Sequence, residues 1–425
     1  MHDLTAFDAA AILIVLAAGL GYLNHRVLGL PSTVGLTVMG TLASLMVVAY
    51  DRLVPSSTLA EQLGGFLADV DFSTTLMEGM LSFLLFAGAM HVNWADMRKG
   101  RWPILVFSTV GVLLSTAIVG FAFQFLTRAL GVEIPLIWCL VFGALISPTD
   151  PVSVMAVMKR AAMPDTLQAT VAGESLFNDG IGVVVFTILI AIATGTETFS
   201  WSFAVSHFLQ EALGGAALGL AVGWIGYVAM KSIDEYIIEV MISLAVVMGG
   251  YSLAMGLHVS GPVAMAVAGL IIGNAGIAHA MSDVTRDHVI KFWALIDEIL
   301  NAVLFLLIGL EVIALEFKPG YIAAGAGAIL IVLAARMISV GVPLVAMTRI
   351  INMGPMAIPT LVWGGLRGGI SVALALALPA SDIRTELLVA TYIVVIFAVV
   401  VQGGSIGWLI RRMKDKFAPE LELNA

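Results

Sequence analysis

The sequence predicts an all-α integral membrane protein with about thirteen transmembrane helices, two of them interrupted. Three observations lead to this fold class. Hydrophobic residues make up 60% of the 425 residues and charged residues only 12%, about half of the roughly 25% charge of a soluble domain. The apolar residues form runs long enough to cross a bilayer as helices, which takes about 20 residues. Two of these runs also contain clusters of proline or glycine.

The runs are uniformly apolar rather than alternating with period two, so a transmembrane β-barrel is excluded. The first run follows Asp3 and Asp8 without a basic segment, so we interpret it as a retained span. No polar stretch is long enough for a soluble domain, and residues 1–425 are predicted to form one membrane domain. Helices are expected at 8–25, 32–50, 73–92, 103–127, 135–158, 168–194, 203–230, 235–256, 260–277, 290–315, 320–347, 356–379 and 386–411.

The basic residues support this count. With thirteen spans, fourteen lysines and arginines fall in the loops on the side of the C-terminus and four in the loops on the other side. Positive residues collect in cytoplasmic loops. The chain is therefore expected to be a multi-pass protein of the cell membrane, with its N-terminus outside and its C-terminus in the cytoplasm.

The composition also argues against several function classes. The net charge of −9 is spread over the loops without a basic tract, so no nucleic-acid partner is expected. The single cysteine, Cys139, excludes an internal disulfide. None of the seven histidines pairs with another metal-ligating residue inside a span, and no nucleophile and base stand together. We therefore expect no enzyme, such as an intramembrane hydrolase, and no cofactor.

The fifth predicted span contains a break, at GALISPTDPVSV. Pro148 and Pro151 each remove a backbone donor, and Pro151 frees the carbonyl group of Ser147. The residues before each proline, Ser147 and Asp150, are disfavoured in helical torsions. An unwound segment at this depth is tolerated only where it lines a cavity. Because Ser147, Thr149 and Asp150 occupy it together, we interpret it as part of an ion site.

The sixth predicted span carries a polar face, at GESLFNDG. Ser175 and Asp179 lie one helical turn apart, and Glu174 and Asn178 form the adjacent stripe. Hydroxyl and carboxylate oxygens suit Na⁺ or Li⁺ and not soft metals. Removing a carboxylate from water disfavours its charged form, so protons compete with cations at Asp179 and the two exchange. Glu174 needs a buried partner, and Arg336 is the candidate.

The twelfth predicted span contains a second break, where glycine pairs flank Arg367 in WGGLRGGISVALALALP. Broken helices in corresponding positions predict inverted repeats that cross at the ion site. Arg367 is expected either beside the cavity or in helix-end packing. Glu298 and Asn301, in the tenth span, are candidates for lining the cavity. Glycines at 215, 219 and 223 indicate close helix packing, either within the chain or between two copies.

Three blocks together resemble the electroneutral sodium/proton antiporters of the NhaP type, which are relatives of the animal sodium/proton exchangers. They are SPTDPVSV at 147–154, GESLFNDG at 173–180 and GGLRGGISVALALALP at 364–379. The resemblance covers essentially the whole chain and implies a homodimer. Within each chain, a core bundle of helices would slide against a dimerisation bundle and move the ion site between the two sides of the membrane. The moving bundle would comprise about 103–194 and 320–412, and the dimerisation bundle about 8–92 and 203–315.

The resemblance also implies roles for the polar residues. Asp179 binds the cation and the proton in turn, Ser175 and Thr149 supply further ligands to Na⁺, and Asp150 acts through water. Glu174 and Arg336 form a structural ion pair. Glu78, on the third span, is a further candidate ligand.

Asn178 precedes Asp179 where electrogenic relatives carry a second aspartate. A neutral amide can cross-link the broken halves through hydrogen bonds without titrating, so we expect one proton per cation and no dependence on voltage.

Three alternatives remain open from the sequence alone. A potassium/proton exchanger could use the same fold, because oxygen ligands alone do not separate Na⁺ from K⁺. A sodium-coupled symporter would need a roomier polar cavity than these few polar residues indicate. A channel fits two crossing broken helices less well than alternating access does.

Overall fold

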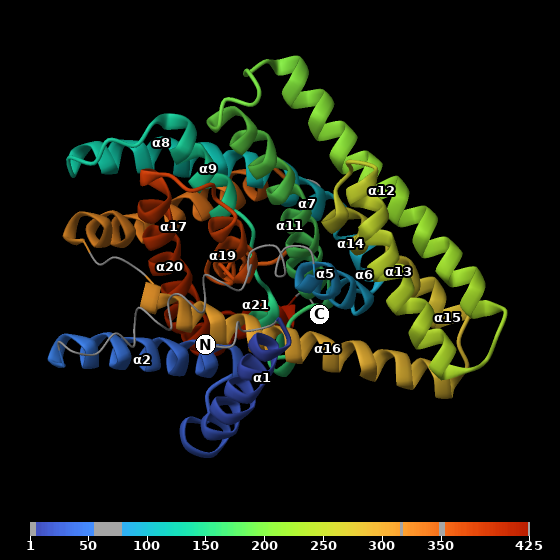
Figure 1. Ribbon diagram of the computed structural model, residues 1–425. Coiled ribbons are helices and arrows are strands. Elements are labelled where there is room, and N and C mark those ends of the chain that lie inside the picture. Colours follow the sequence, from blue (N-terminus) through green and yellow to red (C-terminus); the bar gives the residue numbers. More distant parts are fainter. Residues whose placement is uncertain (1–5, 55–78, 315–317, 348–352, 424–425) are drawn as a thin grey trace.

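The computed structural model describes residues 6–54, 79–314, 318–347 and 353–423, and this part of the chain is almost entirely helical (Figure 1). Each of the thirteen predicted runs contains helix, although the start of the third, together with Glu78, lies outside the described residues. The all-helical fold class is thereby confirmed. The first helices are α1 (Ala6–Leu23), α2 (Ser32–Leu53), α5 (Leu81–Met90), α6 (Trp94–Lys99), α7 (Arg101–Val106), α8 (Val112–Ala129), α9 (Leu136–Ile146), α10 (Val152–Arg160) and α11 (Asp165–Ala193).

The remaining helices follow the predicted order. They are α12 (Trp201–Lys231), α13 (Tyr236–Gly256), α14 (Gly261–Ile271), α15 (Ile277–His279), α16 (Asp283–Leu310), α17 (Pro319–Met347), α18 (Ala357–Trp363), α19 (Gly369–Leu376), α20 (Asp382–Phe397) and α21 (Gly404–Leu423). Wider π-helical turns continue or join some of them, at Asn24–Leu28, Phe107–Gly111, Ile272–Gly276 and Ala398–Gly403.

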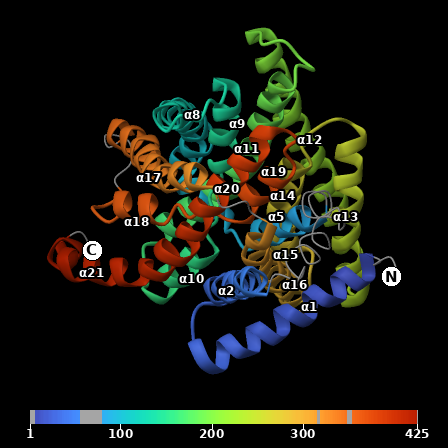
Figure 2. The same cartoon turned by 60° about the vertical axis from the view of Figure 1, so that its left-hand side comes forward.

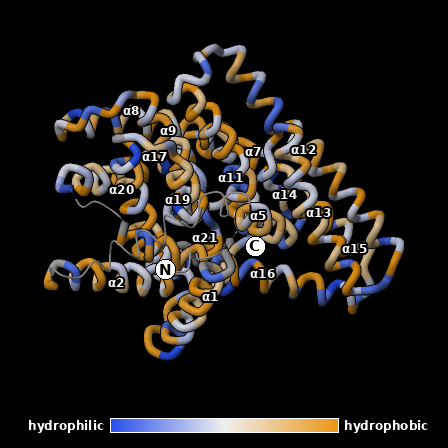
Figure 3. Tube along the Cα trace, viewed as in Figure 1, coloured by the Kyte–Doolittle hydropathy of each residue, from blue (hydrophilic) through white to orange (hydrophobic). Residues whose placement is uncertain are grey.

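Nine helical segments of the described part are long and apolar enough to cross a membrane unaided. The other predicted spans fall short for identifiable reasons. Helix α5 has 10 residues, and the start of its predicted span lies outside the described residues. The helices α9, α10, α18 and α19 are halves of the two interrupted spans, and α16 carries several charged residues, including Asp287, Lys291 and Asp297. Large hydrophobic side chains are exposed on the long helices, for example Leu213, Trp224 and Ile225 on α12. Figure 3 shows that hydrophobic residues predominate along α12 and α13. Such side chains are expected to contact lipid.

Buried apolar residues gather into several cores, of which two organise most of the helices. One joins α8, α9, α17 and α20, where Phe123 packs on Phe142 with ring centroids 4.4 Å apart. The other joins α5, α13, α14 and α16, where Phe86 packs on Trp293 at 4.6 Å. Helix α11 contributes to both cores, through Val185 to the first and Leu176 to the second. The polar face of α11 is thereby held between the two groups of helices.

The glycine repeat on α12 serves packing within the chain. Gly215, Gly219 and Gly223 are buried against α14, and a Cβ atom added to Gly223 would lie 2.9 Å from the Cα atom of Ala268. Side chains at these positions would push the two helices apart. Of the two explanations offered by the sequence, the structure supports the first.

Candidate ion-binding site

The predicted break in the fifth span is present between the end of α9 at Ile146 and the start of α10 at Val152. Arg367 satisfies the carbonyl groups that this break exposes. Its Nη1 donates to the carbonyl oxygen of Ser147 and, at 3.1 Å, to that of Pro148. Buried carbonyl groups without donors are costly, so Arg367 stabilises the unwound segment. It is fully buried and acts on the break rather than on a helix end.

The second predicted break separates α18 from α19, and the two breaks cross. The backbone N–H of Asp150 donates to the carbonyl oxygen of Leu366 at 2.9 Å, as an isolated antiparallel bridge. Gly368 allows this approach, because a Cβ atom there would lie 2.6 Å from the Cβ of Asp150. An antiparallel crossing is the geometry that inverted repeats predict. Figure 2 shows α10, α18 and α21 gathered at one end of the molecule, where α21 contacts both α10 and α18.

Helix α11 presents its polar face to the first break. Ser175 Oγ donates to the Thr149 carbonyl oxygen at 2.5 Å, and Asn178 Nδ2 donates to Thr149 Oγ1 at 2.8 Å. In return, the Thr149 N–H donates to Asn178 Oδ1 at 3.4 Å. Both bonds of Asn178 go to Thr149, so this residue joins α11 to the break between α9 and α10. Ser175, Asn178 and Thr149 therefore lie together, as the sequence predicted.

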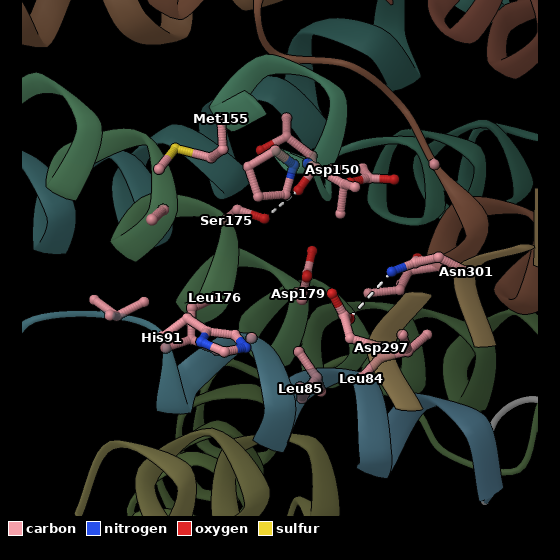
Figure 4. Close-up of a pocket in the computed structure, with 18 of the residues that line it drawn as sticks. Leu84, Leu85, His91, Asp150, Met155, Ser175, Leu176, Asp179, Asp297 and Asn301 are labelled. Carbon is pink, nitrogen blue, oxygen red and sulfur yellow. Dashed lines mark hydrogen bonds between the residues drawn. The ribbon is translucent and has the colours of Figure 1, made fainter. Parts of the chain in front are cut away.

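Asp179 lies one turn beyond Ser175 and faces a cavity of about 610 Å³ (Figure 4). Its side chain is buried, and its Oδ1 atom has no hydrogen-bond partner among the described residues. A buried carboxylate oxygen without a donor needs a proton or a cation to offset its lost hydration. Thr149, Asp150 and Ser175 line the same cavity. The resulting set of hydroxyl, carbonyl and carboxylate oxygens suits a hard monovalent cation.

The opposite wall of the cavity comes from α16. Asn301 is buried and donates through Nδ2 to Asp297 Oδ1 at 3.1 Å, and Figure 4 shows both side chains across from Asp179. Glu298 also lines the cavity, but its side chain is exposed. Sequence reasoning selected Glu298 and missed Asp297. The signal was present, because Asp297 and Asn301 are four residues apart and share one helix face.

The cavity opens at one end of the molecule. Its lining there consists of the exposed residues His91, Asn93, Lys159 and Asp165, at the end of α5, the end of α10 and the start of α11. Arg98, Lys99 and Arg160 follow shortly after or adjoin these residues in the sequence. The cavity therefore connects Asp179 with the surface of the protein at these residues.

Glu174 and Arg336 form the predicted buried ion pair, between Glu174 Oε1 and Arg336 Nη1. The side-chain exposures are 2% and 9%. Arg336 Nε and Nη2 also donate to the Leu361 carbonyl oxygen at 3.1 and 3.0 Å. The pair ties α11 to α17 and α18 beside the second break, and Glu174 does not line the cavity.

Three comparisons agree with this arrangement. Residues 12–412 match the family model described as "Sodium/hydrogen exchanger, transmembrane". The chain is 45% identical over 411 residues to the Na⁺/H⁺ antiporter NhaP of Pseudomonas aeruginosa, and this alignment covers 96% of each chain. It is 33% identical over 346 residues to the Na⁺/H⁺ antiporter NhaH of Halobacillus dabanensis, and that alignment covers 80% of this chain and 84% of the relative. The sodium proton antiporter MjNhaP1 of Methanocaldococcus jannaschii has the same fold, with a TM-score of 0.75 at 19% identity over 96% of this chain and 98% of that one. This chain belongs to the sodium/hydrogen exchanger family.

Proposed function

We propose that this protein exchanges Na⁺ or Li⁺ for H⁺ across the membrane, one for one, with both ions competing for Asp179. The observation that carries the proposal is a carboxylate oxygen of Asp179 that has no partner among the described residues, in a cavity beside two crossing helix breaks. The name of the relative that is 45% identical, a Na⁺/H⁺ antiporter, supports it.

The chemistry of the site explains why exchange is coupled. A cation that enters the cavity meets the Asp179 carboxylate, with the Ser175 hydroxyl and the Thr149 oxygens as further ligands and Asp150 acting through water. Moving an ionised carboxylate through an apolar barrier costs several kcal/mol, so the empty, charged form does not cross. Asp179 crosses with a proton or with a cation, and each crossing therefore carries one of the two ions.

Asn178 keeps this exchange electroneutral. Since its amide is held by Thr149 and does not titrate, one positive charge moves inward for each one that moves outward. The bundle of residues 103–194 and 320–412 carries the site, and the bundle of residues 8–92 and 203–315 supplies the fixed wall with Asp297 and forms the contact of a homodimer.

The excess of basic residues orients the protein in the cell membrane with its C-terminus in the cytoplasm. The open end of the cavity lies among these basic residues, so this conformation faces the cytoplasm. The other conformation of the cycle closes this end and opens the cavity to the outside.

The deciding experiment uses purified protein in liposomes that contain a pH-sensitive dye. A pulse of Na⁺ or Li⁺ is expected to move protons in the opposite direction, at a rate unchanged by a membrane potential imposed with potassium and valinomycin. Liposomes without protein provide the control. Proton movement with K⁺ and not with Na⁺ or Li⁺ would show that the exchanged cation is K⁺, and the proposed exchange mechanism would stand. A rate that follows the potential would contradict one-for-one exchange, and no proton movement with any cation would contradict antiport.

Asp297→Asn is expected to raise the Na⁺ concentration for half-maximal exchange several-fold while leaving the maximal rate nearly unchanged. The substitution removes a negative charge from the cavity wall and keeps a side chain that can bond to Asn301. One opposite charge across a partly hydrated cavity contributes on the order of 1 kcal/mol to cation attraction. Glu298→Gln, the adjacent and exposed residue, is the matched control and is expected to change half-saturation less. Equal effects of the two variants would show that Asp297 has no particular role.

A further inference from the structure

A second cavity, of about 730 Å³, lies on another face of α11 and shares no lining residue with the cation cavity. We call it the elbow groove, because the bend between α6 and α7 forms one wall. Trp94, Arg98, Arg101 and Trp102 line its polar end, and its apolar lining includes Leu105, Phe177 and Ile181. Its volume lies within the ordinary range for small-molecule sites, roughly 300–1,000 Å³.

The polar end carries two positive charges that no acidic group in the described part of the chain balances. Arg98 and Arg101 are exposed, and neither has a carboxylate partner in the described part of the chain. The neighbouring Asp96 pairs with Lys99 at 3.1 Å instead. The Arg101 guanidinium lies over the Trp102 ring, 5.5 Å from its centroid. Both guanidinium groups thus have free donors for an anion.

The position of the groove along the chain matches the surface of a membrane. Helix α7 begins the apolar span Arg101–Ala129, so the elbow lies where this span leaves the bilayer. Tryptophan is enriched at this depth, and Trp94 and Trp102 are 57% and 49% exposed. From Arg101 to Ser108 the wall descends about 10 Å into the apolar region, at 1.5 Å per residue.

The floor of the groove belongs to the helix that carries the cation site. Phe177 and Ile181 each lie two residues from Asp179, which corresponds to about 200° around the helix. They therefore point away from the cation cavity, toward the elbow. A molecule in the groove would press on α11 from behind Asp179 and join it to α6 and α7.

We propose that the elbow groove binds an anionic phospholipid. The phosphate group contacts Arg98 and Arg101, because guanidinium groups match phosphate oxygens in charge and geometry. An acyl chain lies along Leu105, Phe177 and Ile181. A soluble anion would account for the two arginines and not for the apolar floor, and a lipid without net charge would leave the two arginines unbalanced.

The test measures thermal unfolding of the full-length protein in detergent, with palmitoyl-oleoyl phosphatidylglycerol, the corresponding phosphatidylcholine, or glycerol phosphate added. A ligand that binds only the folded state raises the unfolding midpoint. Phosphatidylglycerol is expected to raise the midpoint of the wild type by several degrees, and the double variant Arg98→Ala/Arg101→Ala is expected to lose most of this shift. The matched control is Arg411→Ala/Arg412→Ala, which removes an exposed basic pair outside the groove, where Arg412 lies 5.2 Å over the Trp408 ring. The control is expected to keep the shift.

A second variant examines the acyl chain. Leu105→Asp places a negative charge in the groove and keeps both arginines, so it is expected to abolish the shift as well; a retained shift would contradict the proposed path of the chain. The proposal is also overturned if Arg98→Ala/Arg101→Ala keeps the full shift, or if phosphatidylcholine gives the same shift as phosphatidylglycerol. A full shift with glycerol phosphate alone would identify a soluble anion in place of the lipid.

Discussion

Asp179→Asn is expected to abolish sodium-dependent proton movement in liposomes, down to the level of empty vesicles, while the protein stays folded. The amide has nearly the shape of the carboxylate, so the walls of the cavity are retained. It cannot release a proton, and it offers a cation a neutral oxygen in place of a charged one. Both halves of the exchange are therefore lost together.

The same competition gives the wild type a defined pH dependence. At lower pH the proton occupies Asp179 more often, so more Na⁺ is needed for half-maximal exchange. In the variant no sodium-dependent response is expected at any of these pH values, because the group for which the two ions compete is absent. The measurement is initial dye response against Na⁺ concentration at several pH values.

Asp165→Asn is the matched control, since it makes the same chemical change on the same helix. Asp165 is exposed in the first turn of α11, at the open end of the cavity. Loss of its charge costs a few tenths of a kcal/mol in helix-dipole stabilisation, and exchange is expected to persist. Residual sodium-dependent exchange by Asp179→Asn would show that another carboxylate of the cavity carries the proton.

The sequence predicted most of the fold because the bilayer restricts the choices. A span needs a run of apolar residues, and a charged residue inside such a run is rare. Both the spans and the candidate site residues can therefore be identified from the sequence alone. The two prolines Pro148 and Pro151 indicated one break, and the glycines around Arg367 indicated the other. Ser175 and Asp179 then shared a face through helical periodicity alone.

The sequence could not predict which side chains of elements distant along the chain face one another. Nothing local shows that Arg367 donates to Ser147 and Pro148, which lie 220 and 219 residues earlier. Nor does it show that Asp297, rather than Glu298, faces Asp179 across the cavity. The rotation of α16 about its own axis is fixed by its packing against α2, α5 and α13. The sequence of α16 alone therefore does not show which of its faces lines the cavity. The elbow groove likewise forms only when α6, α7 and α11 come together.

Arg336→Met is expected to lower the free energy of unfolding by roughly 3–5 kcal/mol, which is the usual cost of leaving one buried charge without its partner. Glu174 would remain 2% exposed in an apolar setting, and the Leu361 carbonyl would also lose two donors. The double variant Glu174→Leu/Arg336→Met is expected to recover most of the loss, because apolar residues often replace a buried ion pair at little cost. It is not expected to recover all of it, since the Leu361 carbonyl remains without its donors, at about 1–3 kcal/mol.

The control pair is Asp287 and Lys291 on α16, which are 2.7 Å apart and mostly exposed. Exposed pairs contribute at most about 1 kcal/mol, so Lys291→Met should unfold almost as the wild type does. Thermal or denaturant unfolding of the purified variants gives the comparison. If Arg336→Met alone were as stable as the double variant, burial would not be penalising Glu174, and the pair would have no part in holding α11 against α17 and α18. Rescue in the double variant would instead separate the two carboxylates of α11 by role: Glu174 can be replaced together with its partner because it holds helices, whereas no second substitution restores a titrating group at Asp179.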